Sequence, residues 1–254
     1  VFSFGVHHYV QWGGEDPVNG VQQPEGLKDY FRVVLGQEGG DNASGSDQAN
    51  KLGNHLGSYK VSYAQELGNS KLQFLFQSLV EDETGVDGRT FPDGSWGLYF
   101  QKNEKSFIEG VVYEYIQTTW QGGTNSISGG NDNYFNYGFG TYRDGWTYND
   151  KVIGLPFFLV FPGFPYGVDN NEFSGHHLGL GGSVGSLSYR LKTSFVKNYG
   201  TRRFPLPIEQ VIYSGLEMQY RLSNTSSLEM ILGADFSDLN PDRYTLGVGY
   251  RYQF

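Results

Sequence analysis

The chain has 254 residues, a formal net charge of −9 at pH 7 and no cysteine. The negative charge argues against nucleic acid as a partner, because the chain offers no cluster of Lys and Arg that would neutralise phosphates. Without cysteine, the chain forms neither disulfides nor thiolate metal sites.

The residue types favour strands over helices. Aromatic residues make up 17% of the chain and glycine occurs 37 times, and both are poor helix formers that suit short strands and turns. No stretch approaches 18 consecutive apolar residues, so we expect no transmembrane helix. A membrane barrel is still compatible with this composition, because barrel strands alternate and give a weak hydropathy signal.

The chain opens directly in a strand pattern. In VFSFGVHHYVQW, residues Phe2, Phe4, Val6 and Val10 fall on one side of an extended chain. There is no initiating Met and no signal peptide. We therefore interpret the sequence as the C-terminal portion of a longer protein.

The same two-residue alternation recurs to the C-terminus. It predicts ten strands, near 1–12, 56–66, 70–80, 95–103, 106–119, 173–183, 185–196, 210–223, 227–237 and 243–254. The last five are consecutive and joined by short links, as in an antiparallel meander. Three long polar segments, at about 13–54, 81–94 and 120–172, interrupt the pattern.

Long connections that alternate with tight turns are typical of outer-membrane barrels. The last strand, DRYTLGVGYRYQF, places aromatic residues on one face and small or polar residues on the other, and it ends on Phe254. A soluble β-sandwich is the alternative, but strands of about twelve residues with one aromatic face are unusual there. The predicted fold class is all-β: an antiparallel transmembrane outer-membrane β-barrel over residues 1–254, with about ten strands in this chain and part of a larger barrel.

The segment 131–158, NDNYFNYGFGTYRDGWTYNDKVIGLPFF, combines aromatic rings with amide, carboxylate and guanidinium groups. Rings stack on sugar C–H surfaces and the planar polar groups make paired hydrogen bonds with hydroxyls, so this mixture suits a glycan. The alternative is a loop folded into the lumen or over its mouth, with the aromatic residues forming a small core. The candidate polysaccharide-binding residues are Tyr142, Arg143, Asp144, Trp146 and Tyr148, together with Trp12 and Trp120.

This segment and HHYVQWGGEDP (7–17) resemble the Wzi-type capsule assembly proteins, particularly those of Bacteroidota. The shared features are an aromatic and Asn-rich run followed by GWTY and by IG–PFF, and an earlier strand that ends in QWGG. The resemblance implies an outer-membrane barrel that holds capsular polysaccharide at the cell surface and acts as a lectin, not as an enzyme. It also implies more than ten strands, preceded by periplasm-facing helices.

The histidine pairs 7–8 and 176–177 do not predict a metal site, because adjacent residues on a strand point to opposite faces. Ser174 lies near His176 in sequence, but a nucleophile and its base must also meet in space with an orienting third group. The acidic segments 36–50 and 82–95 do not match the calcium-loop spacing and are interpreted as solvated loops. No catalytic residue, metal or other cofactor is expected.

One face of the predicted barrel strands carries charges that would line the lumen. The basic members are Arg190, Lys192, Arg221 and Arg251, and the acidic members on neighbouring strands are Glu209, Glu217, Glu229 and Asp235. Ion pairing between these strands is the favoured interpretation, and binding of acidic glycans or other anions is the alternative.

The sequence therefore predicts an outer-membrane protein of a Gram-negative bacterium that binds or anchors capsular or other surface polysaccharide. Its other expected contacts are outer-membrane lipid, lipopolysaccharide and other outer-membrane proteins. Two alternatives stay open, a porin-like channel and a structural barrel subunit of an outer-membrane complex.

Overall fold

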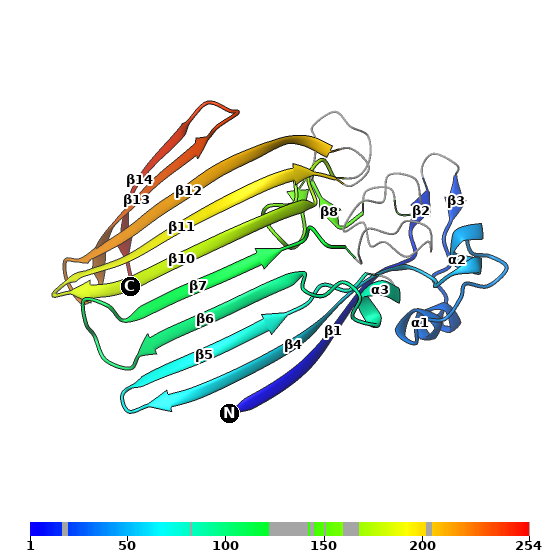
Figure 1. Ribbon diagram of the computed structural model, residues 1–254, viewed down its shortest axis with the longest axis horizontal. Helices are drawn as coiled ribbons and strands as arrows, with labels where there is room; N and C mark the ends of the chain where they lie inside the picture. Colours follow the sequence, from blue (N-terminus) through cyan, green and yellow to red (C-terminus); the bar gives the residue numbers. More distant parts are fainter. Residues whose placement is uncertain are drawn as a thin grey trace.

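The computed structural model describes residues 1–16, 20–81, 83–121, 142, 145–149, 151–159, 168–201 and 205–253. One antiparallel sheet of ten strands dominates it (Figure 1). The strands are β1 (Phe2–Gln11), β4 (Asn54–Leu67), β5 (Ser70–Gln77), β6 (Gly94–Lys102), β7 (Gly110–Gln117), β10 (Glu172–Val184), β11 (Leu187–Gly200), β12 (Pro205–Arg221), β13 (Ser226–Ser237) and β14 (Arg243–Tyr252). The predicted all-β class and the ten antiparallel strands are confirmed.

The sheet is open in the described part of the chain. Its strands lie side by side in chain order, with β1 at one edge and β14 at the other, and these two strands do not pair with each other. Each edge strand therefore presents one row of backbone N–H and C=O groups without a strand partner. The predicted ring is not closed by these ten strands.

The connections differ between the two ends of the sheet (Figure 1). At one end, here called the turn end, the strands are joined through residues 68–69, 103–109, 185–186 and 222–225. At the opposite, loop end, the longer connections carry β2 (Glu15–Asp16), β3 (Val21–Gln22), α1 (Leu27–Val34), α2 (Gly45–Ala49), α3 (Glu83–Val86), β8 (Thr147–Tyr148) and β9 (Lys151–Val152). None of the helices in the described ranges is long and apolar enough to cross a membrane.

Helix α1 lies in a segment that the sequence pattern predicts only as a polar loop. The backbone N–H of Gly26 donates to Asp29 Oδ2 at 3.3 Å, which satisfies one of the free donors at the helix start. Arg32 reaches back to Asp29 at 2.9 Å, an i,i+3 ion pair. These local interactions stabilise the helix. It is too short for the spacing of its apolar residues to predict a helix from the sequence.

Strand β12 begins at Pro205, five residues before its predicted start. Proline has no backbone N–H and usually argues against a strand. Here β13 pairs with β12 only from Val211 onward, so residues 205–209 have no ladder partner on that side within the described part of the chain. The two prolines at 205 and 207 are tolerated because this stretch behaves as an edge strand.

The register places apolar side chains on one face across the whole sheet. A single row of directly paired residues shows this pattern, with Leu180, Leu191, Leu216, Leu232 and Leu246 on five successive strands. Many large apolar residues of this outward face are exposed, among them Phe2, Phe4, Leu246 and Val248. An apolar surface of this extent marks contact with a membrane or with another protein.

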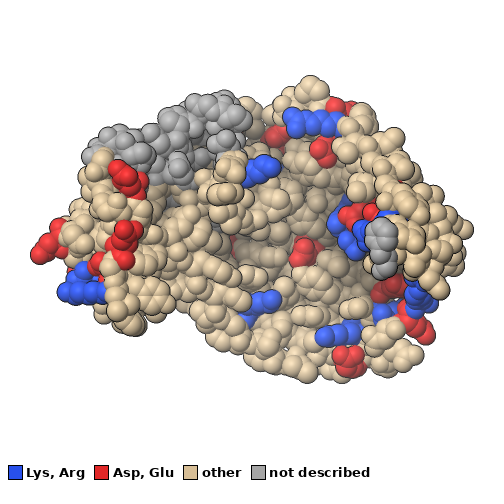
Figure 2. All heavy atoms as spheres, turned by 180° about the vertical axis from the view of Figure 1, so that it is seen from behind, with Lys and Arg blue, Asp and Glu red and all other residues tan. Residues whose placement is uncertain are grey.

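The opposite, hollow face is lined by small and charged residues. The row next to the leucines carries Gly179, Lys192, Gly215, Gly233 and Thr245 on the same five strands. Figure 2 looks at this side of the molecule and shows acidic and basic side chains in and around the hollow. The two faces of the sheet thus differ sharply in polarity.

The hydrophobic core lies in the hollow at the loop end. Phe173 and Val196 project from β10 and β11 and are almost completely buried. Trp146 and Phe158 from the connection between β7 and β10 pack against them, as do Ile116 and Val168. Part of the longest connection is therefore folded onto the hollow face.

Candidate functional site

Five of the seven predicted polysaccharide-binding residues fall in the described part of the chain, and Arg143 and Asp144 lie outside it. Trp146 has only 7% of its surface exposed and belongs to the hydrophobic core. Its indole Nε1 is buried without a hydrogen-bond partner among the described residues. Because almost all of its surface is buried, this tryptophan contributes to the fold of the connection and offers no surface to a sugar.

Tyr142 links two of the long connections. Its hydroxyl donates to Asp47 Oδ2 at 3.1 Å, across 95 positions of sequence. Asp47 is itself buried in α2. Burial raises the pKa of the Tyr142 phenol well above its ordinary value, and the neighbouring Asp47 carboxylate raises it further. Tyr142 therefore acts as a neutral hydrogen-bond donor between the connections.

Trp12 and Tyr148 have different surroundings. The Trp12 ring, just after β1, lies 6.1 Å from the Tyr30 ring of α1, centroid to centroid, at an angle of 52°. Tyr148, in the two-stranded β8–β9 sheet, has 72% of its surface exposed. Trp12 therefore helps to seat α1, whereas Tyr148 is open to a ligand.

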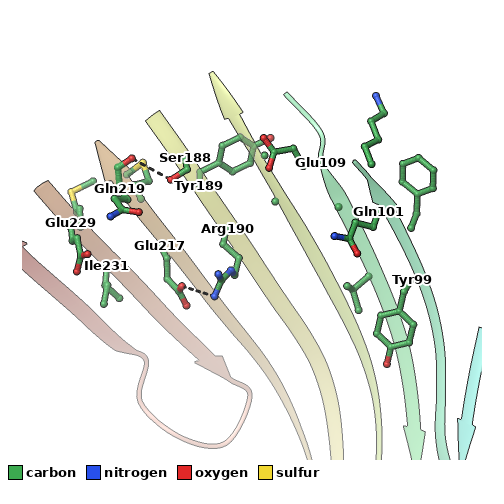
Figure 3. Close-up of a pocket in the computed structure, with 18 of the residues that line it drawn as sticks. Tyr99, Gln101, Glu109, Ser188, Tyr189, Arg190, Glu217, Gln219, Glu229 and Ile231 are labelled. Atoms are coloured by element: carbon green, nitrogen blue, oxygen red, sulfur yellow. Dashed lines mark hydrogen bonds and ion pairs between the residues drawn. The ribbon is translucent and has the colours of Figure 1, made fainter. Parts of the chain in front are cut away.

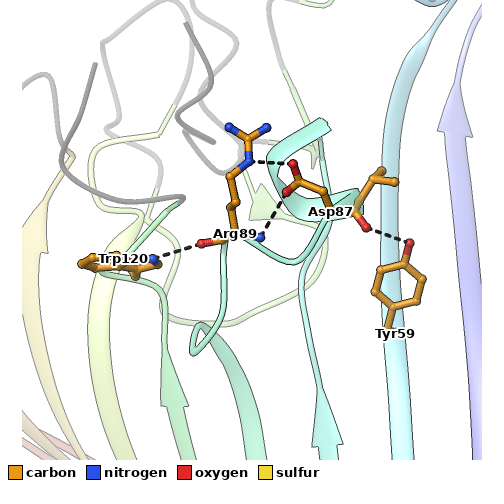
Figure 4. Close-up of polar contacts among 5 residues, drawn as sticks. Tyr59, Asp87, Arg89 and Trp120 are labelled. Carbon is orange, nitrogen blue, oxygen red and sulfur yellow. Dashed lines mark hydrogen bonds and ion pairs between the residues drawn. The ribbon is translucent and has the colours of Figure 1, made fainter. Parts of the chain in front are cut away.

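Trp120 is an exposed aromatic ring held in a fixed orientation (Figure 4). It follows β7 and keeps 42% of its surface exposed. The indole Nε1 donates to the backbone oxygen of Arg89 at 3.0 Å. The Arg89 side chain in turn pairs with Asp87, with 2.6 Å between Nε and Oδ2. An exposed indole, a guanidinium and a carboxylate thus lie together at the loop end.

A buried carboxylate anchors the backbone of Trp120. Asp93, 1% exposed, accepts the backbone N–H of Trp120 at 3.0 Å and that of Gln121 at 2.7 Å. Thr118 next to them donates its hydroxyl to the backbone oxygen of Asn171 at 2.8 Å. This anchor joins both ends of the β7–β10 connection to the segment before β6.

The sequence gives little indication of this anchor. Asp93 stands in FPDGSW, where an Asp before a Gly indicates a turn. Its partners are 27 and 28 positions away and come close only when β6 and β7 pair. The residues that position Trp120 were therefore not predicted.

The hollow face holds a cavity of about 850 Å³ toward the turn end (Figure 3). Glu217 Oε2 pairs with Arg190 at 3.2 Å, and Glu217 Oε1 pairs with Lys192 at 2.9 Å. Arg251 pairs with Glu229 at 2.8 Å. The predicted ion pairing between neighbouring strands is confirmed for these five residues.

Other predicted members of this charged set are used differently. Glu209 accepts hydrogen bonds from the side chains of Asn198, Ser237 and Asn240 and makes no ion pair within the described ranges. Arg221 likewise has no carboxylate partner there. Asp235 also makes no ion pair among the described residues, so five of the eight charges predicted to line the hollow are paired across strands and three are not.

The histidines form aromatic and hydrogen-bonded pairs. His8 Nε2 lies 2.8 Å from His55 Nδ1, with the rings stacked. His176 Nδ1 lies 2.9 Å from the Tyr113 hydroxyl, and His177 Nδ1 lies 2.7 Å from the Ser194 hydroxyl. Over the described ranges, no three His, Asp or Glu side chains are grouped as metal ligands.

Comparison with known proteins agrees with the fold and the sequence motifs. The sequence profile of the family described as capsule assembly protein Wzi matches residues 1–165, well over half of the chain. No curated protein and no solved structure matches the chain. The matched region includes β1 and QWGG, the Asp93–Trp120 anchor and the GWTY segment. This chain belongs to the Wzi capsule assembly protein family.

Proposed function

We propose that the chain forms the wall of a single outer-membrane β-barrel domain in a Gram-negative bacterium and binds capsular polysaccharide at its loop end. The family membership and the continuous apolar outward face support the placement in a membrane. Short turns at one end and long connections at the other support loops that face the cell exterior.

The exposed indole of Trp120 carries the proposal for the binding site. Its backbone is held by Asp93 and its Nε1 by the Arg89 carbonyl, so the ring loses little freedom when a sugar stacks on it. The Arg89 guanidinium and the Asp87 carboxylate supply donors and acceptors for hydroxyl groups at its side. Tyr148 is the second proposed stacking ring. Arg143 and Asp144 stay proposed contacts, and Trp12, Tyr142 and Trp146 are proposed to support the loops.

The test is binding of the detergent-purified protein to capsular polysaccharide from its own source. Trp120→Ala should weaken binding about tenfold, equivalent to ~1.4 kcal/mol, while Trp120→Phe should keep part of the affinity. Tyr220→Ala, an exposed aromatic residue at the turn end, is the matched control and should bind as wild type. Equal binding by all of these proteins would refute the site.

A channel is the second candidate, favoured by the cavity and by the small residues Gly179, Gly215 and Gly233 on the hollow face. The aromatic core at the loop end works against passage of large solutes. Steady conductance in planar bilayers, together with no polysaccharide binding, would select the channel over the lectin. Absence of both activities, with co-purification of envelope proteins in fixed ratio, would select a structural subunit.

A further inference from the structure

Charged residues are distributed unevenly between the two faces of the sheet. Among the described residues, most of the charged side chains at regularly paired strand positions project from the hollow face. They are Lys60, Glu66, Lys71, Glu114, Arg190, Lys192, Glu209, Glu217, Arg221, Glu229, Asp235, Arg243 and Arg251. Two lysines project outward instead, Lys102 at the turn end and Lys197 at the loop end. Their positions on an otherwise apolar face call for an explanation.

Lys197 stands at the rim of an outward-facing groove. The groove is a cavity of about 580 Å³, within the size range of ligand pockets. Its apolar lining comes from Phe195, Ile212 and Phe236 on three successive strands, and these side chains are partly exposed. Lys197 and Tyr199 line it nearer the end of β11. The groove thus combines an apolar floor with a polar rim.

The Lys197 ammonium is available to a ligand. It is exposed and has no ion pair or hydrogen bond to the rest of the described chain. The nearby acid of this groove, Asp238, accepts the backbone N–H of Gln210 at 2.8 Å. A lone lysine at the border of an apolar surface typically extends its charged end toward lipid headgroups.

We propose that this groove is a binding site for a phosphorylated glycolipid of the lipid A type, with an acyl chain on the Phe195–Ile212–Phe236 floor and a phosphate on Lys197. An unpaired ammonium attracts a phosphate headgroup, and the Tyr199 ring at the rim suits the boundary between acyl chains and water. The site rests on the proposed outer-membrane placement with the loops outside. It does not depend on polysaccharide binding at Trp120.

The experiment is native mass spectrometry of the detergent-purified chain after incubation with diphosphorylated lipid A, dephosphorylated lipid A or phosphatidylglycerol. Wild type should retain diphosphorylated lipid A in preference to the other two lipids. Lys197→Gln should lower its occupancy about fivefold, the effect of one basic side chain near anionic lipid, and Lys197→Arg should restore it. Ile212→Trp, which fills the floor, should also lower it.

Lys102→Gln is the matched control, because it removes an outward lysine at the turn end, and its lipid occupancy should equal that of wild type. Equal occupancy in Lys197→Gln and wild type would overturn the proposal, as would equal retention of phosphatidylglycerol or no retention of lipid A. Should Ile212→Trp fail to fold, the two Lys197 variants decide alone. Polysaccharide binding measured on Lys197→Gln should be unchanged, which separates this site from the loop-end site.

Discussion

At the scale of single residues, Asp93 shows how backbone donors hold a buried carboxylate. Its carboxylate accepts two backbone N–H groups and also the side-chain amide of Gln117, at 3.3 Å. Charge-assisted bonds of this kind are stronger than neutral ones and offset the cost of removing the carboxylate from water. The same bonds fix the direction in which Trp120 leaves β7.

We therefore expect Asp93→Asn to destabilise the folded protein by about 2 kcal/mol, because the amide replaces one acceptor oxygen by a donor. Hydrogen exchange of the Trp120 and Gln121 amides should accelerate at the same time. The measurements are amide exchange and thermal unfolding followed by heat-modifiable mobility on gels. Asp87→Asn, at an exposed side chain, should stay within about 0.5 kcal/mol of wild type. Equal behaviour of the two variants would contradict the anchoring role.

Tyr142 gives a prediction that depends on pH. Because its folded-state pKa is raised, its contribution to stability is fully present below about pH 10, the value of a free tyrosine, and decreases as the pH rises above that value. Tyr142→Phe should thus cost about 1 kcal/mol at pH 8 and less at pH 11. Urea unfolding at the two pH values measures the difference. A cost that grows with pH would show that the hydrogen bond to Asp47 has been misassigned.

At the scale of elements, the contact between the β6–β7 turn and β10 requires glycine. A Cβ built on Gly182 would lie 1.8 Å from the backbone oxygen of Phe107. The turn is held there by backbone bonds, from Glu109 N–H to Gly181 O and from Ser183 N–H to Ser106 O, each 2.8 Å. The turn and β10 therefore cannot move apart at Gly182 without breaking at least one of these two backbone hydrogen bonds.

Gly182→Ala should therefore destabilise the protein by about 1–3 kcal/mol, the usual cost of overpacking. Gly181→Ala is a close control, since its Cβ would meet the Tyr189 oxygen at 3.6 Å, an ordinary contact. Thermal unfolding in the same detergent compares the two variants. If both unfold at the wild-type temperature, the turn moves aside more easily than its hydrogen bonds suggest.

The strands and connections also show which features of the structure can be predicted from the sequence. The period of two residues is a local signal, so the ten strands and the cross-strand pairs of Glu217 and Arg251 could be predicted. The burial of Trp146 and the exposure of Trp120 could not. Both are aromatic residues in the same polar segment, and their difference arises from packing against Phe173 and from bonds to Asp93. Those partners become neighbours only once the sheet has formed.

At the scale of the whole molecule, the outward and hollow faces should respond oppositely to charge. Leu216 lies in the middle of the leucine row, and an arginine there would face hydrocarbon in the proposed orientation. Leu216→Arg should destabilise the protein folded in lipid vesicles by about 2–4 kcal/mol. Gln219→Arg on the hollow face should fold like wild type. Folding yield and urea titration in vesicles test the pair, and equal stability of the two variants would refute the membrane orientation of the faces.

The ten strands follow one another in the sheet in the order of the chain, from β1 to β14. Each of these ten strands therefore pairs with the strand made just before or just after it, and none of the ten has to insert between two strands that are already paired. Assembly of such a sheet is a growth process in which hairpins are added one after another, with a low entropy cost for each closure even where a long connection intervenes. The same order makes the architecture modular in its length: a hairpin gained or lost at either edge leaves the register of the interior strands unchanged.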